Sequence, residues 1–148
     1  MHIKKIYIIL LLNSIFCFSQ SIEEKINRDT QLAFDYTEKN KLGDAIKLSE
    51  KTLNNAKEIA NDSLIAFSYN NLGISYSKLG NIQKGIEYFK KAIVHFEKID
   101  DTLKRLVVIN NIGEAYEDIR DFKHSIKYFR DLLKLAEKTK DDNTMLFP

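Results

Sequence analysis

The sequence predicts an all-α fold in which antiparallel helix hairpins stack side by side, an α-solenoid. Three observations predict it: an internal repeat of forty residues, apolar residues spaced three and four apart between turn-like segments, and no proline before residue 148. A hairpin of two helices cannot bury both of its faces alone, so repeats of this kind pack against their neighbours. At 148 residues the chain has room for one such domain.

The first segment, MHIKKIYIILLLNSIFCFSQS, has the pattern of a secretory signal peptide. Two lysines precede an apolar run over 6–12 that resumes at 15–18, and small and polar residues follow. We therefore expect a signal peptide over residues 1–19, cleaved after Ser19, on a bacterial protein exported to the periplasm, the cell surface or the medium. An uncleaved leader that anchors the chain to the membrane is the alternative.

Cleavage at this position changes the chemistry of the mature chain. Acylation of Cys17, as in a lipoprotein, is disfavoured because Phe16 stands where such signals have a small residue. With Cys17 removed, no cysteine is left for a disulfide or a thiolate metal site. Lys4 and Lys5 also leave, so 23 basic and 21 acidic residues become 21 of each. A net charge of zero predicts no nucleic-acid partner.

The repeat is aligned by its tyrosines, Tyr36, Tyr76 and Tyr116, which stand forty residues apart. A small residue precedes each tyrosine by three places, and a second small residue follows the first by twelve. The first set is Ala33, Gly73 and Gly113, and the second is Ala45, Gly85 and Ser125. A glycine inside a helix costs about 1 kcal/mol against alanine. The glycines therefore predict a close approach of two helices, with the tyrosines in the core.

Turn-like segments at regular points divide the repeats into helices. We expect six of them after the leader, at about 22–39, 42–60, 62–79, 82–99, 102–119 and 122–139. They pair into three hairpins, at about 22–61, 62–101 and 102–141, within a domain over 20–142. Residues 143–148 are then a C-terminal tail or the truncated start of a fourth repeat.

This pattern resembles the tetratricopeptide repeat (TPR) family over about 22–142. The second copy matches nearly all signature places: Tyr69, Leu72, Gly73, Tyr76, Gly80, Gly85, Phe89 and Ala92. The third copy has Ile109, Ile112, Gly113, Tyr116, Ser125, Phe129 and Leu132, and the degraded first copy has Asp29, Leu32, Ala33, Tyr36, Ala45, Ser49 and Thr52. The period is similar to the longer-helix branch found in kinesin light chains and bacterial peptide-responsive regulators. The resemblance implies a right-handed superhelix.

The resemblance also implies a concave binding face formed by the first helix of each hairpin. The places expected to face inward are Asn27, Thr30, Gln31, Phe34, Glu38, Phe67, Asn70, Asn71, Ile74, Lys78, Val107, Asn110, Asn111, Glu114 and Asp118. Asparagine amides one repeat apart can bond the backbone of an extended peptide. The alternative is that they cap or solvate the helix face. Phe34, Phe67 and Ile74 either form an apolar floor or stack between adjacent first helices of neighbouring hairpins.

Other kinds of site find little support. The basic clamp that some members of the family use for a C-terminal carboxylate is rejected, since Thr30, Phe34 and Val107 occupy its places and only Asn71 matches. The histidines show no metal-ligand spacing, and the acidic group on 114–118 lacks an acid–base partner. We expect no enzyme activity, no cofactor and no metal.

The last predicted helix is too apolar for the end of a repeat array. It carries Ile126, Phe129, Leu132, Leu133 and Leu135, whereas a terminal helix normally has a polar outer face. Leu146 stands forty residues after Leu106, where a fourth repeat would begin. We expect an exported, non-enzymatic scaffold that binds a protein or an extended peptide, and a homodimer through this helix is one way to cover its apolar face. The alternative is the sensing or dimerisation module of a longer membrane protein with a histidine kinase or transcription regulator.

Overall fold

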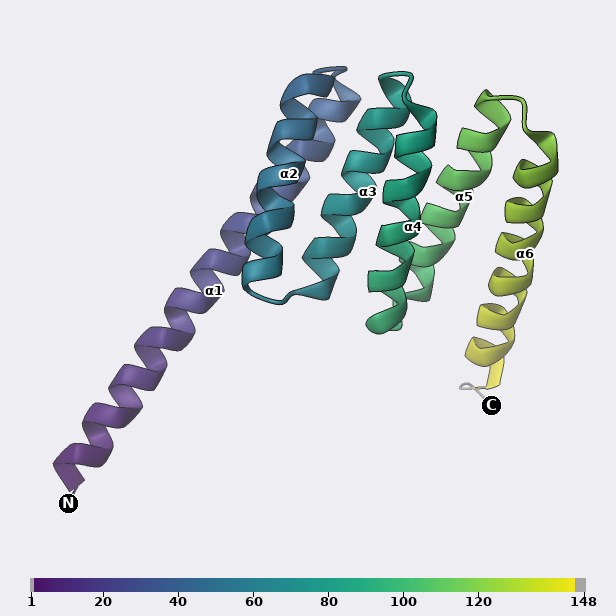
Figure 1. Ribbon diagram of the computed structural model, residues 1–148. Coiled ribbons are helices and arrows are strands. Elements are labelled where there is room, and N and C mark those ends of the chain that lie inside the picture. Colours follow the sequence, from purple (N-terminus) through teal and green to yellow (C-terminus); the bar gives the residue numbers. More distant parts are fainter. Residues whose placement is uncertain (1, 146–148) are drawn as a thin grey trace.

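The computed structural model describes the backbone of residues 2–145 and the side chains of residues 20–140. Within that range it contains helices and no strand. The helices are α1 (His2–Glu38), α2 (Leu42–Glu58), α3 (Asp62–Lys78), α4 (Ile82–Lys98), α5 (Thr102–Asp118) and α6 (Phe122–Met145). Successive helices run antiparallel and lie side by side in one array (Figure 1). The predicted all-α stack of hairpins is confirmed.

The helices fall into two rows, which we call the A helices (α1, α3 and α5) and the B helices (α2, α4 and α6). Each A helix contacts the B helix that follows it, and α1 contacts α3 as α3 contacts α5. The bounds of α2 to α5 agree with the expected ones within two residues. The A helices therefore form a continuous wall, from which the candidate site is built.

The two terminal helices are longer than expected. The first was expected to begin near residue 22, but α1 begins at His2 and its N-terminal part projects beyond the stack (Figure 1). Neither glycine nor proline interrupts residues 2–38, so nothing in the chain stops the helix there. At the other end α6 continues to Met145, and the predicted fourth-repeat position, Leu146, lies outside the described residues.

A residue in the left-handed conformation ends each of the first five helices. These residues are twenty apart: Asn40, Ala60, Gly80, Asp100 and Arg120, with φ between 51° and 87°. Only Gly80 adopts this conformation without a steric penalty. One residue later, the side chains of Asn61, Asn81, Asp101 and Asp121 accept a hydrogen bond from the first turn of the next helix. At these four junctions the helix end and the next helix start are thus specified by adjacent residues, whereas Lys41 provides no side-chain cap for α2.

The glycines of the second and third repeats lie where the helices of a hairpin touch. A Cβ on Gly73 would lie 2.5 Å from the ring of Phe89, and one on Gly113 would lie 2.6 Å from the ring of Phe129. A Cβ on Gly85 would lie 2.8 Å from the carbonyl oxygen of Gly73 and would also clash with the Ser77 hydroxyl. The predicted close approach is therefore present.

The first repeat reaches the same packing with different residues. Ala33 replaces the first glycine, and Ser49 replaces the phenylalanine that covers that glycine in the later repeats. Ala33 and Ser49 are both fully buried. Because Ala33 has a Cβ where Gly73 has none, the partner position has no room for an aromatic ring. The small Ser49 is thus matched to Ala33.

The core has two clusters, one on each side of α3. The first contains Ile86, Phe89 and Phe96 with residues of α3 and α5, and the second joins Ile26, Leu53 and Leu72 across α1, α2 and α3. The tyrosines expected in the core are half-buried. Tyr76 stacks on Tyr88, and Tyr116 stacks on Tyr128, each with ring centroids 5.5 Å apart.

Polar contacts also join the helices. Buried hydroxyl pairs link Thr37 to Ser75 over 2.7 Å and Thr52 to Ser68 over 3.0 Å. At the edge of α3 and α4, His95 Nδ1 lies 2.5 Å from the Asp62 carboxylate. That hydrogen bond, with help from Lys98, lowers the pKa of Asp62 below its ordinary value despite partial desolvation.

We predict that Gly73→Ala lowers the free energy of unfolding by about 1–2 kcal/mol in urea. Overpacking against the buried Phe89 ring costs about 1–3 kcal/mol, more than alanine gains in helix propensity. Gly43→Ala is the control, because no atom lies within 4 Å of its Cβ position. That variant should be neutral or more stable by up to about 1 kcal/mol. Equal effects of the two changes would contradict the hairpin geometry.

Candidate functional site

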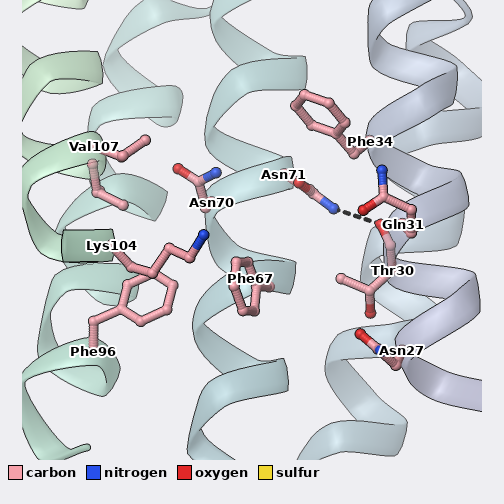
Figure 2. Close-up of a pocket in the computed structure, with 11 residues that line it drawn as sticks. Asn27, Thr30, Gln31, Phe34, Phe67, Asn70, Asn71, Phe96, Lys104 and Val107 are labelled. Carbon is pink, nitrogen blue, oxygen red and sulfur yellow. Dashed lines mark hydrogen bonds between the residues drawn. The ribbon is translucent and has the colours of Figure 1, made fainter. Parts of the chain in front are cut away.

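The A helices line three cavities that follow one another along α3. The central cavity, of about 290 Å³, lies between α1, α3 and α5 (Figure 2). Its lining is Asn27, Thr30, Gln31, Phe34, Phe67, Asn70, Asn71, Phe96, Lys104, Val107 and Val108. Most of these places were expected to face inward. Phe96, Lys104 and Val108 were not among the places that the family resemblance implied.

The central cavity has an apolar floor. Phe34 and Val107 are exposed on its two sides, and Phe67 lies between them (Figure 2). The ring of Phe67 also packs edge-on against Phe96, with centroids 5.2 Å apart. Phe67 therefore lines the cavity and also packs against the B helix of its own hairpin, whereas the expected alternative was stacking between adjacent A helices. Its removal would disturb packing as well as the floor.

The asparagines form bonds between successive A helices. Asn71 is 4% exposed, and its Nδ2 donates to the backbone oxygen of Thr30 over 2.9 Å (Figure 2). Asn111 Nδ2 donates to Asn70 Oδ1 over 3.2 Å. Each amide thus reaches a residue 41 places earlier, on the previous A helix. The tandem asparagines contribute to stacking of the repeats, a role that the sequence interpretation did not include.

Some of the hydrogen-bonding groups of these asparagine amides are not used in stacking. The Asn70 NH₂ group and the Asn71 oxygen have no hydrogen-bond partner among the described residues, and both side chains line the central cavity. One amide supplies donors and the other an acceptor, which together match a peptide group. Asn110 lines none of the three cavities, and its Nδ2 donates to Glu114 Oε1 over 2.7 Å.

A second space, the C-end cavity, lies beside the later turns of α3 and measures about 230 Å³. It is lined by Ile74, Ser77, Lys78, Phe89, Asn111, Glu114, Ala115 and Asp118. Lys78 Nζ pairs with Glu38 Oε1 over 2.9 Å, so its charge is compensated. Among the described residues, Glu114 and Asp118 have no cationic partner within 4.0 Å. This end of the wall is therefore negative.

A third space, the N-end cavity, of about 400 Å³, lies beside the first turns of α3. Its charged residues are Glu23 and Glu24, and it shares Asn27 and Phe67 with the central cavity. Asn61 Nδ2 donates to Glu23 Oε1 over 2.9 Å. The C-end cavity shares no residue with the central one, but its Asn111 is bonded to Asn70 of the central cavity. The three cavities thus follow one another along the wall, and we call them together the groove, which is apolar in the middle and acidic at both ends.

The position of Lys104 could have been read from the sequence. It is the one charged residue that lines the central cavity, and its Nζ lies 5.4 Å from the centroid of the Phe67 ring. It precedes Val107 by three places and therefore lies on the same face of its helix. Of the fifteen places expected to face inward, all but Glu38 and Asn110 line one of the three cavities.

The described part of the chain has neither a membrane-spanning helix nor a metal-binding cluster. No helix there is both long and apolar enough to cross a membrane. No group of three or more histidine, cysteine, aspartate or glutamate side chains in the same range could hold a metal ion.

Comparison with known proteins agrees with the fold. A family model described as tetratricopeptide repeat matches residues 26–98 and 64–138. The heat shock protein sti1 homolog of Schizosaccharomyces pombe is 34% identical over 76 residues, a segment that covers 51% of this chain but only 13% of that protein. The crystal structure of the TPR domain of Arabidopsis FLU superposes with a TM-score of 0.72 at 12% identity, covering 79% of this chain and 98% of that one.

We predict that Asn71→Ala lowers the free energy of unfolding by about 1 kcal/mol, because a buried bond between two A helices is lost. Asn110→Ala, which removes a bond on the helix surface, should change it by less than about 0.5 kcal/mol. Urea unfolding of the two variants beside the wild type measures both values. If Asn71→Ala proved as harmless as the control, the amide would have no part in the stacking.

Proposed function

The chain belongs to the tetratricopeptide repeat family, and on that premise we propose that its A helices bind an extended peptide segment of a partner protein. Domains of this family mediate protein–protein interaction in general. The observation that carries the proposal is the central cavity, where an apolar floor lies next to unpaired amide capacity on Asn70 and Asn71. Apolar pockets with a few placed polar groups are typical of ligand sites.

We propose no catalytic activity for this groove. The tetratricopeptide fold is in general a non-enzymatic scaffold. In the three cavities the ionisable side chains are carboxylates and lysines, with no nucleophile–base pair. A groove of this kind can hold and orient a peptide chain, and we propose that this is its function. The partner we expect is a protein or a peptide.

We propose further that the protein is exported, on the strength of the lysines and the apolar run in residues 1–19. A second candidate function is the sensing or dimerisation module of a longer membrane signalling protein. The α6 helix favours this, because Ile126 is 57% exposed whereas Ile86, its equivalent one repeat earlier, is fully buried in the cluster shared with α5. A second copy of the chain could cover this face.

We predict that Val107→Arg weakens peptide binding at least tenfold, because the side chain would fill the central cavity and add charge next to Lys104. The control is Val94→Arg on α4. Val107 and Val94 are 53% and 51% exposed, but Val94 lines none of the three cavities. Peptides selected from a random display library on the wild-type protein would be titrated against both variants. Equal losses for the two variants would place the binding site elsewhere.

Native mass spectrometry of the protein from the producing cell tests the export and signalling proposals together. We predict a chain that begins at Gln20, found outside the cytoplasm. A chain that retains residues 1–19 inside the cytoplasm would contradict export. A chain much longer than 148 residues would favour the signalling module, and a mass twice that of one chain would favour the homodimer.

A further inference from the structure

We infer that the peptide accepted by this groove carries one bulky apolar side chain flanked on both sides by basic residues. The inference rests on the proposed function and deepens it, since it names the chemistry of the ligand. It follows from the order of the three cavities along α3 and from the charges that line each of them.

The middle of the groove selects the apolar residue. Phe34, Phe67 and Val107 line a space of about 290 Å³, enough for one aromatic or large aliphatic side chain and too small for a folded element. Lys104 is the only charged residue among its lining side chains. A basic side chain placed here would leave water for an apolar floor beside another cation, which is unfavourable.

The two ends of the groove select the charge of the flanking residues. Glu23 and Glu24 line the N-end cavity, and Glu114 and Asp118 line the C-end cavity. The remaining lysine of the groove wall, Lys78, is paired with Glu38. Each end therefore presents two carboxylates to a bound chain. Acidic residues at these places would be repelled, and lysine or arginine would find a complementary charge.

The helix geometry sets the spacing between the apolar and basic residues. The α3 residues that line the central and C-end cavities are centred about seven positions apart, which is about 10 Å at the rise of an α-helix. The corresponding separation from the N-end cavity is about five positions, or about 7 Å. An extended chain covers these distances in about two to three residues. The expected ligand thus has a basic residue two to three places on either side of the apolar one.

A random nonapeptide display library, selected on the full protein, tests the inference. We expect the enriched peptides to share an aromatic or large aliphatic residue with lysine or arginine two to three places away on both sides. Enriched peptides without that charge preference, or with acidic flanks, would overturn the inference while the proposed function stands. If no peptide is enriched over a parallel selection on Val107→Arg, the proposed function fails, and the inference with it.

Two double variants then assign the charge preference to the C-end cavity. On the enriched peptides, Glu114→Gln with Asp118→Asn should reduce affinity about three- to tenfold, as expected for two exposed ion pairs. Glu87→Gln with Glu117→Gln removes the same charge outside the three cavities and should leave affinity unchanged. Addition of salt should narrow the difference between the two. Equal affinities for the two double variants would overturn the assignment.

Discussion

In the second and third repeats, the contact between a glycine and an aromatic ring sets how closely the two helices of a hairpin pack. At Gly73 the ring of Phe89 occupies the place of a Cβ, and Gly85 lies against the backbone of the same turn. The two helices of the hairpin therefore approach as closely as their backbones allow. With this spacing, residues of α4 such as Ile86 and Phe96 cluster with Val108 and Ile112 of α5. Neighbouring hairpins therefore share a core. Without the close approach, the A helices would not form a continuous wall.

A constant spacing of the turns repeats that local contact at regular intervals and so produces a regular groove. The left-handed residues at 40, 60, 80, 100 and 120 end the helices at intervals of twenty, and four of the five are not glycine. The chain thus accepts a steric cost at four turns to keep the period. Because the period holds, equivalent residues of neighbouring A helices lie at the same height. Asn71 can then reach Thr30, and Asn111 can reach Asn70, with the same offset of 41 residues.

How much could be predicted from the sequence depended on whether a residue acts within its own repeat. The ends of α2 to α5 and the close approach at Gly73 and Gly113 follow from spacing along one chain segment, and the structure bears them out. The inward places were implied by the resemblance to the repeat family. The partner of Asn71 and the hydroxyl pair of Thr37 with Ser75 join residues about forty apart, and the choice between a groove amide and a stacking amide depends on the distance between two helices. The start of α1 at His2 was missed for another reason. The helix continues through the apolar first segment, and the pattern of a signal peptide contains no helix boundary.

The positions that repeat and those that differ between repeats divide the molecule into scaffold and binding surface. Small residues at 33, 73 and 113 and tyrosines at 36, 76 and 116 are nearly the same in every copy, and they make contacts inside the stack. The groove places 34, 74 and 114 hold phenylalanine, isoleucine and glutamate, and the places 27, 67 and 107 hold asparagine, phenylalanine and valine. A packing role would require similar residues at equivalent places, because the surroundings are equivalent. Their variation has no such explanation, but it gives the groove an apolar centre and acidic ends. The residues that repeat therefore form the wall, and the residues that differ between repeats determine which peptide the wall can bind.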